Sequence, residues 1–147
     1  MKFYLALILA RLARLGIKIL NKSSGTSFGG KLALTICPDF LKYCPKYITK
    51  DIITITGTNG KSTTSGLAAQ ILQTAHQKII HNLDGANMLT GFANVFALNL
   101  KPLRRFDYAV LECDEAYLTK LYDYINANYL IVTNIFKDQV DRYGFRR

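Results

Sequence analysis

The chain has 147 residues, half of them apolar, which is enough for one sizeable core but short for a typical two-domain enzyme. Its formal net charge of +9 is concentrated at the front, because residues 1–50 hold nine bases and one acid, whereas residues 51–147 hold ten bases and nine acids. Such a basic segment indicates contact with an anionic surface, either lipid headgroups or nucleic acid. The three cysteines lack CxxC spacing, so neither a disulfide framework nor a zinc site is indicated.

Residues 3–20 are apolar with bases inserted at helical spacing, which predicts an N-terminal amphipathic helix. Arg11, Arg14, Lys18 and Lys22 share one face, and the opposing stripe is Leu5, Ile8, Leu12, Leu15 and Ile19. The longest uncharged run is residues 3–10, whereas a membrane span needs roughly 20 residues. Because the bases follow the apolar run, unlike those of a secretory signal, we expect the chain to stay in the cytoplasm.

Two arrangements of this helix stay open. It lies peripherally on the inner face of the membrane, held by apolar burial and anionic lipid, or it docks on the protein's own body with its bases in water. The next stretch, residues 21–31, is rich in turn formers and predicts a flexible link or a binding loop. Residues 1–50 are therefore interpreted as a basic leader and linker.

From residue 51 onward, short β-rich runs alternate with helical segments, which is typical of βαβ units and predicts an α/β fold with a parallel sheet and flanking helices. The predicted strands are Ile52–Thr56, Lys78–His81, Tyr108–Glu112 and Tyr129–Thr133. The predicted helices lie near Lys61–Ala75, Met88–Leu98 and Ala116–Ile125. Ligands of such sheets bind beyond the carboxyl ends of the strands.

A glycine-rich loop follows the first predicted strand and precedes a helix. We expect it to bind the phosphates of ATP through Gly57, Thr58, Asn59, Gly60, Lys61, Ser62 and Thr63. The glycines let backbone amides approach phosphate oxygens, Lys61 adds a mobile charge, and the hydroxyl of Ser62 is placed to bind Mg²⁺. The general P-loop pattern would require glycine where Ile55 stands, so the loop is a shorter variant, and residues 51–147 are interpreted as a partial ATP-binding domain.

Acidic residues follow the third predicted strand in the run Glu112 to Glu115. Glu112 ends the strand itself and is the preferred second Mg²⁺ ligand, because hard cations take carboxylate oxygens. Asp114 and Glu115 are better explained as residues at the start of the next helix.

The loop 57–64, together with the polar segment 133–144, resembles the ATP-binding central domain of the Mur ligases and of their relative folylpolyglutamate synthase. Further runs narrow the resemblance to the MurT branch, the ligase subunits of lipid II isoglutaminyl synthase. These runs are residues 25–27 before Lys31, 82–88, 112–116 and 138–144. The resemblance covers nearly the whole chain, and its most specific parts are the phosphate loop and the run Asp-Gln-x-Asp-Arg-Tyr-Gly.

The resemblance implies ATP and Mg²⁺ as cofactors, Lys61 as the catalytic cation, and Ser62 with Glu112 as metal ligands. It implies activation of a carboxylate as an acyl phosphate, which an amine then displaces. In the MurT branch the acceptor is the α-carboxyl of D-glutamate in lipid II, and ammonia comes from a GatD-like glutamine amidotransferase subunit. Gln139 stands where many Mur ligases have a metal-binding histidine, which leaves a second metal without that ligand.

Three alternatives to this interpretation stay open. One is another ligase of the Mur or folylpolyglutamate synthase type, and a second is a small membrane-surface P-loop ATPase. The third is a non-enzymatic remnant. Relatives continue well beyond the residue that corresponds to Arg147, so we expect these 147 residues alone not to be a competent ligase. Nucleic acid is not an expected partner, because the bases follow an amphipathic helix and no recognition module is present.

Overall fold

The protein is described by a computed structural model that covers residues 1–19, 27–82 and 88–136. Within these residues the chain forms one parallel sheet in the order β2-β3-β1-β4. The strands are β1 (Ile48–Thr56), β2 (Ile79–His81), β3 (Phe106–Glu112) and β4 (Tyr129–Val132). Isoleucine and threonine dominate β1, and β3 is buried from Ala109 to Glu112, as expected for central strands of a parallel sheet.

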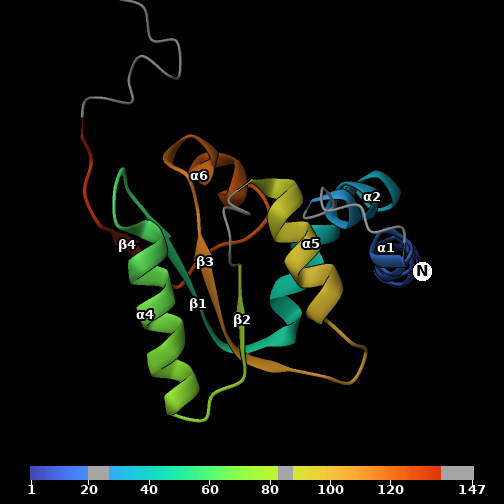
Figure 1. The fold of residues 1–147 in the computed structure, drawn as a ribbon, viewed down its shortest axis with the longest axis horizontal. Helices are drawn as coiled ribbons and strands as arrows, with labels where there is room; N and C mark the ends of the chain where they lie inside the picture. The colour runs from blue at the N-terminus through green and yellow to red at the C-terminus, as the bar shows by residue number, and fades with distance from the viewer. Residues whose placement is uncertain (20–26, 83–87, 137–147) are drawn as a thin grey trace, which may run out of the picture.

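Helices cover both faces of this sheet, so the predicted α/β class is confirmed (Figure 1). Helix α4 (Lys61–Thr74) lies against one face, and α5 (Leu89–Asn99) lies on the other. Helix α6 (Glu115–Tyr122) connects β3 to β4 near the carboxyl end of the strands. The four predicted strands and three predicted helices of this part are all present, although β1 begins four residues earlier than predicted.

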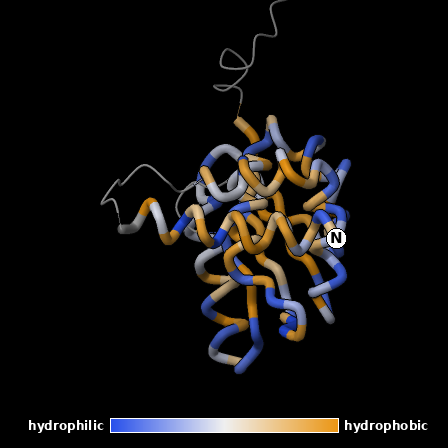
Figure 2. The backbone as a smooth tube through the Cα atoms, turned by 90° about the vertical axis from the view of Figure 1, so that its right-hand side faces the viewer, coloured by the Kyte–Doolittle hydropathy of each residue, from blue (hydrophilic) through white to orange (hydrophobic). Residues whose placement is uncertain are grey.

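The leader forms further helices that pack outside α5. They are α1 (Lys2–Ile19), α2 (Phe28–Ile36) and α3 (Phe40–Tyr43), followed by the 3₁₀ turn η1 (Cys44–Tyr47). Figure 2 shows α1 crossing the face of the molecule that lies to the right in Figure 1. The predicted N-terminal helix is therefore present, and it is docked on the protein's own body.

The docked face of α1 consists of small and apolar side chains. Ala6, Leu7 and Ala10 are buried, and Phe3 stacks on the ring of Phe40 with centroids 5.0 Å apart. Arg11 also turns inward, where its guanidinium donates to the backbone carbonyls of Ala97 (3.0 Å) and Leu100 at the end of α5. Carbonyls at a helix carboxyl terminus have no intrahelical partner and carry partial negative charge, so an arginine is well suited to this position.

The predicted apolar stripe of α1 is not the docked face. Leu5, Ile8, Leu12 and Leu15 are between 50% and 57% exposed. Docking thus uses the face of Ala6, Ala10, Leu7 and Phe3 and leaves these members of the predicted stripe in solvent. None of the helices in the described ranges is long and apolar enough to span a bilayer.

Residues 28–31 form the start of α2, so the prediction of a link or loop over residues 21–31 is wrong for these four residues, while residues 21–26 lie outside the described ranges. The two glycines that suggested a turn serve close helix packing instead. A Cβ atom on Gly30 would lie 1.8 Å from the carbonyl oxygen of Thr90 in α5, and one on Gly29 would lie 2.7 Å from Oδ1 of Asn94. Only glycine allows α2 and α5 to approach this closely.

One hydrophobic core joins the leader to the sheet. Its largest fully buried side chains include Phe40 and Leu41 from α3 and Phe92 and Phe96 from α5, and it extends to Leu111 of β3. The proposed division between leader and domain at residues 50 and 51 stays a prediction. The strand β1 begins at Ile48, on the leader side of that division.

Candidate functional site

The carboxyl ends of the strands lie side by side and bring distant residues together. In the sheet register Ile55 is opposite Glu112, and Thr56 is opposite Val132. The loop after β1, the end of β3 and the segment after β4 therefore meet at one edge, where α4 also begins. This is the edge at which parallel α/β sheets bind ligands.

Two glycines with positive φ shape the loop between β1 and α4. Gly57 has φ of 130° and Gly60 has φ of 81°, values that favour glycine. Gly57 is also sterically confined, because a Cβ atom there would lie 2.2 Å from Oγ1 of Thr133 and 2.7 Å from the carbonyl oxygen of Asn134. The glycine at position 57 thus lets the loop pass directly beside the segment after β4.

Thr133 and Asn134 hold this loop from the side. The amides of Thr58 and Asn59 donate to the carbonyl and the side-chain oxygen of Asn134, each at 2.9 Å. Asn59 also accepts hydrogen bonds at its carbonyl oxygen from Asn134 Nδ2 (3.0 Å) and from Thr133 Oγ1 (2.7 Å). The amides of Thr58 and Asn59 are therefore engaged within the protein rather than open to a ligand.

The amides that remain for an anion are those at the start of α4. The amide of Thr64 makes the first intrahelical bond, to the carbonyl of Gly60 at 2.9 Å, so the amides of Lys61, Ser62 and Thr63 precede the helical ladder. Gly60 provides no side-chain cap for them. The exposed side chains of Ser62 and Thr63 leave this turn accessible. The helix terminus is thus suited to bind phosphate.

The side chain of Lys61 folds back over the loop. Its ammonium donates to the carbonyl oxygens of Gly57 and Thr58, the latter at 3.3 Å. It also pairs with Asp114 at 3.4 Å and Glu115 at 3.7 Å, two acids at the start of α6. Lys61 is thus positioned by its own loop and by the carboxyl end of β3.

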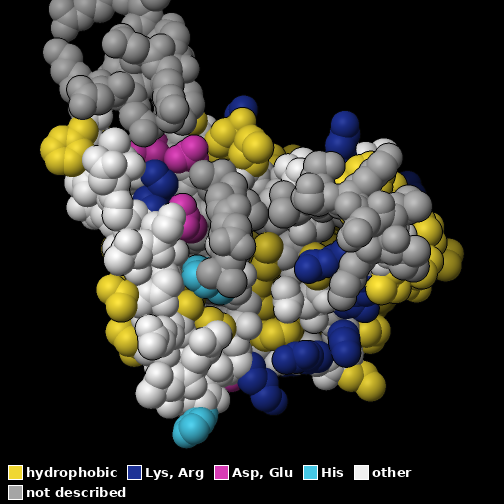
Figure 3. Space-filling view, viewed as in Figure 1, with side chains coloured by type: hydrophobic (Ala, Val, Ile, Leu, Met, Phe, Trp, Pro, Cys, Tyr) yellow, Lys and Arg dark blue, Asp and Glu magenta, His cyan; other side chains and the backbone are white. Residues whose placement is uncertain are grey.

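Glu112 is a nearly buried carboxylate, 6% exposed, and its partners are hydroxyl groups. Oε1 accepts a hydrogen bond from Ser62 Oγ at 3.0 Å, and Oε2 accepts one from Ser65 Oγ at 3.4 Å. The structure therefore brings together the two residues that the sequence predicted as Mg²⁺ ligands, and it adds Ser65, which the sequence did not single out. Figure 3 shows acidic side chains gathered beside a basic one at this edge.

Asn82 fixes the backbone of Glu112 and was not predicted as part of the site. Its side-chain oxygen accepts from the amide of Glu112, and its side-chain amide donates to the carbonyl of Glu112, both at 2.8 Å. The side chain of Asn82 thus takes the place of a backbone group and extends the pairing of β2 with β3 by one residue. A polar residue directly after a predicted strand of the parallel sheet is the signal in the sequence that could have indicated it. The neighbouring His81 is half-buried, and desolvation lowers the pKa of its imidazole.

The donor set fits a hard cation bound together with a nucleotide. Among the described residues Glu112 has no cationic partner within ion-pair distance, and a buried carboxylate is unfavourable without one. The described part of the chain contains no group of three or more His, Cys, Asp or Glu side chains that could hold a metal alone. Mg²⁺ usually takes only one or two protein oxygens and completes its shell with phosphates and water, so Ser62 and Glu112 suffice.

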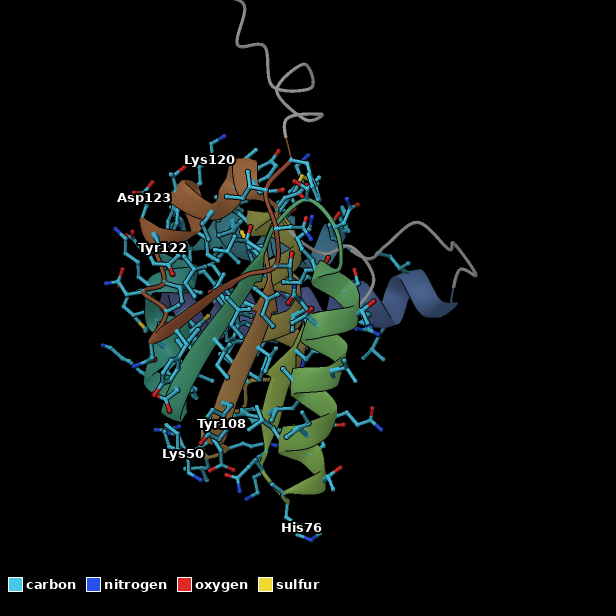
Figure 4. The ribbon with its side chains drawn as sticks, turned by 90° about the vertical axis from the view of Figure 1, so that its left-hand side faces the viewer. Lys50, His76, Tyr108, Lys120, Tyr122 and Asp123 are labelled. Carbon is cyan, nitrogen blue, oxygen red and sulfur yellow. The ribbon has the colours of Figure 1, made fainter. Side chains whose placement is uncertain are left out.

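Different side chains lie at the opposite end of the sheet, where the strands begin. Figure 4 shows Lys50, Tyr108 and His76 at that end and Lys120, Tyr122 and Asp123 at the end that holds the phosphate loop. The ammonium of Lys50 lies 5.4 Å from the centre of the Tyr108 ring. The predicted run 137–144, including Gln139, lies outside the described residues, as do residues 83–87.

Comparison with known proteins gives a consistent result. The family profile "Mur ligase middle domain" matches residues 55–146. The MurT subunit of lipid II isoglutaminyl synthase (glutamine-hydrolyzing) from Streptococcus pneumoniae is 40% identical over 120 residues, which are 82% of this chain and 26% of that protein. Its counterpart from Staphylococcus aureus is 35% identical over 144 residues, 98% of this chain and 32% of that protein.

More distant matches have related names. A UDP-N-acetylmuramoylalanine–D-glutamate ligase from Agrobacterium fabrum is 34% identical over 131 residues, 85% of this chain and 24% of that protein. The solved structure of a UDP-N-acetylmuramoylalanyl-D-glutamyl-2,6-diaminopimelate–D-alanyl-D-alanyl ligase from Acinetobacter baumannii is 23% identical, with a TM-score of 0.45, over 56% of this chain and 17% of that one. The chain thus spans about a quarter to a third of the MurT proteins that it matches.

Proposed function

This chain belongs to the Mur ligase family, and on that premise we propose that it provides the ATP-binding part of an amide-forming ligase in peptidoglycan synthesis. Members of the family depend on ATP, typically with Mg²⁺. The observation that supports the proposal is the hydrogen bond of Ser62 to Glu112 beside the open amino terminus of α4. It places a hydroxyl, a carboxylate and helix amides within one turn of each other.

Each residue of the site has a proposed role. The amides of Lys61, Ser62 and Thr63 bind phosphate oxygens, and Gly57 and Gly60 provide the backbone shape. Thr58 and Asn59 act through the hydrogen bonds that tie the loop to Asn134. Ser62 and Glu112 hold Mg²⁺, which supplies charge neutralisation on the phosphates when bound.

Lys61 is the proposed catalytic residue. Phosphoryl transfer depends on positioning and on stabilising the charge of the transferred group, and an ammonium held at the loop provides both. Its contacts with Asp114 and Glu115 keep the ammonium at the site before the nucleotide arrives. Binding of a triphosphate therefore requires the ammonium to exchange part of these contacts for phosphate oxygens.

The proposed substrate is the α-carboxyl group of D-glutamate in the stem peptide of lipid II. ATP converts this carboxyl to an acyl phosphate, and ammonia then displaces phosphate to form the amide. The relatives with 35–40% identity support this, because their names describe a glutamine-hydrolysing lipid II isoglutaminyl synthase. A GatD-like glutaminase subunit is the proposed source of ammonia.

A second candidate is ligation of an amino acid rather than ammonia. The relative from Agrobacterium fabrum, named as a ligase that adds D-glutamate, favours it, since it matches over 85% of the chain. Both candidates use the same phosphate loop and differ in the amine. An assay that offers lipid II with ammonia, or a UDP-linked muramoyl peptide with an amino acid, separates them.

Calorimetry with Mg-ATP tests the nucleotide site directly. We expect binding by the 147-residue chain and a loss of roughly tenfold to a hundredfold in affinity for Lys61→Ala, the size of one charge-assisted contact. Lys50→Ala is the matched control, because Lys50 lies at the opposite end of the sheet. Equal affinity of the parent chain and Lys61→Ala would exclude the proposed role of Lys61.

Turnover measurements separate the ligase from the remaining alternatives. A small surface ATPase would hydrolyse ATP without lipid II, whereas a ligase subunit binds ATP and awaits its acceptor. The expectation that 147 residues alone do not complete the ligase reaction stays a prediction. Amide formation from lipid II, ammonia and ATP by the purified chain would contradict it.

A further inference from the structure

The outward side of α1 carries an apolar stripe without a partner among the described residues. Leu5, Ile8, Leu12 and Leu15 recur at helical spacing and are each about half exposed. They lie opposite Ala6 and Ala10, which are fully buried against the body. Because the helix is already held by its other face and by Arg11, the stripe is not needed for docking.

A second apolar side chain projects from the loop that follows α5. Leu103 is 98% exposed, and it is flanked by Lys101, Arg104 and Arg105, all of them exposed. With Lys78 these residues line a shallow hollow. Figure 1 shows that the loop extends to the same side of the molecule as α1.

Charge on this side is mostly positive, although the exposed Asp39 lies beside Lys2 at the amino end of α1. The helices α1, α2 and α5 and the loop 100–105 contain no acidic residue. Apart from Arg11, which is turned inward onto α5, the described basic side chains of these elements are Lys2, Arg14, Lys31, Lys101, Arg104 and Arg105. Figure 3 shows basic side chains on the lower right beside hydrophobic ones, whereas acidic side chains gather at the phosphate loop on the left.

We propose that α1 and the loop 101–105 together form a membrane-binding surface that rests on an anionic lipid bilayer. The leucine and isoleucine side chains of the stripe enter the boundary between headgroups and acyl chains, while the exposed bases around Leu103 contact lipid phosphates. A second copy of the chain is a poorer occupant, because a symmetric contact through α1 would bring two such basic surfaces together. The proposal needs no nucleotide, so it stands apart from the ligase function.

Single tryptophans report on this surface, because the chain has none of its own. Leu12→Trp places an indole in the stripe, and Ile71→Trp places one on α4, where Ile71 is 68% exposed on the other side of the sheet. With vesicles of equal parts phosphatidylcholine and phosphatidylglycerol, we expect a blue shift and protection from aqueous quencher for Leu12→Trp. We expect neither change for Ile71→Trp. Matching shifts in the two proteins would overturn the proposal.

Vesicle flotation then tests the energetic contribution of the stripe. The double variant Leu12→Gln, Leu15→Gln should bind the anionic vesicles at least about tenfold more weakly than the parent chain. Leu67→Gln, Ile71→Gln is the matched control on α4, and it should bind like the parent chain. Circular dichroism confirms folding of each variant. Three outcomes would each refute the lipid surface. They are equal binding to vesicles of pure phosphatidylcholine, unchanged binding of the stripe variant, and a dimer in sedimentation that depends on the stripe.

Discussion

Ser62 Oγ donates a 3.0 Å hydrogen bond to Oε1 of Glu112, although the two residues are 50 positions apart in the chain. The contact exists because β1 and β3 are parallel neighbours, so the helix that follows β1 begins beside the last residue of β3. It is the contact on which the proposed Mg²⁺ site depends.

Glu112→Gln should therefore reduce affinity for Mg-ATP by roughly tenfold to a hundredfold, because the amide cannot replace a charged ligand. In EDTA the loss of affinity should disappear. The variant should bind free ATP at least as tightly as the parent chain, since a carboxylate near the phosphates has been neutralised. Titrations with and without Mg²⁺ measure both values. Asp123→Asn, which changes an exposed acid at the carboxyl end of α6, is the control.

Gly57→Ala should unfold the phosphate loop. Its φ of 130° disfavours a side chain, and the added Cβ atom would collide with Thr133. We expect destabilisation of about 1–3 kcal/mol and a loss of ATP binding. Gly66→Ala in α4, where a Cβ atom meets nothing within 4 Å, should instead stabilise the chain by about 0.5–1 kcal/mol. Urea unfolding measures the free energy of unfolding of both variants. Equal values would contradict the positive φ of Gly57 and its close approach to Thr133.

Gly30→Ala should separate α2 from α5. The new Cβ atom would lie 1.8 Å from the carbonyl oxygen of Thr90, a backbone atom that cannot rotate away. Overpacking of this kind costs about 1–3 kcal/mol or more of folding free energy. Gly16→Ala in α1 has free space and serves as the control. A Gly30→Ala variant with the melting temperature of the parent chain would show that the leader helices do not pack as described.

Asn134→Ala should loosen the loop without removing any proposed ligand group. The side chain makes two hydrogen bonds to the backbone of Asn59, each worth about 1 kcal/mol. Amide hydrogen exchange at Asn59 should accelerate, and ATP affinity should fall. Asn126→Ala, an exposed asparagine before β4, leaves the loop intact. Unchanged exchange at Asn59 would mean that the bracing contact is absent in solution.

The buried thiols should make stability depend on alkaline pH. Burial, with smaller contributions from Asp114 and Glu115, raises the pKa of Cys113 from 9.0 to about 12. The folded chain thus keeps this proton where the unfolded chain loses it, so stability is complete below pH 9 and declines as pH rises toward 12. Unfolding in urea between pH 8 and 10.5 should show a shallower decline for Cys113→Ala. Alkylation by iodoacetamide at pH 8 should require unfolding, because all three cysteines are buried.

Local patterns were sufficient to predict the central part of the fold. The strand Ile52–Thr56, the glycine loop and the helix from Lys61 form one contiguous unit, and each of its elements has a strong local signal. Glu112 was predicted as a metal ligand because it ends a hydrophobic strand, and the structure places it beside Ser62, while its role as a ligand stays a prediction. Residues 133 and 134 were noted only as a polar segment.

The packing of the leader helices and the residues that support the candidate site depend on contacts between distant parts of the chain, which no local sequence pattern contains. Gly29 and Gly30 favour a turn by composition, but the neighbouring helix α5 makes them part of a tightly packed helix. Asn82 and Asn134 position the site through backbone hydrogen bonds to residues 30 and 75 positions away. The amphipathic pattern of α1 was recognised, but periodicity alone does not state which face packs inward.

The bracing of the loop by Asn134 also has a consequence for synthesis on the ribosome. The central strand β1 and the glycine loop emerge early, yet the side-chain contacts that order Asn59 come from a residue made 75 positions later. The nucleotide loop therefore cannot reach its final shape cotranslationally until β4 has left the exit tunnel and paired with β1. Until then the nascent chain exposes one edge of β1 and depends on β3 alone for alignment.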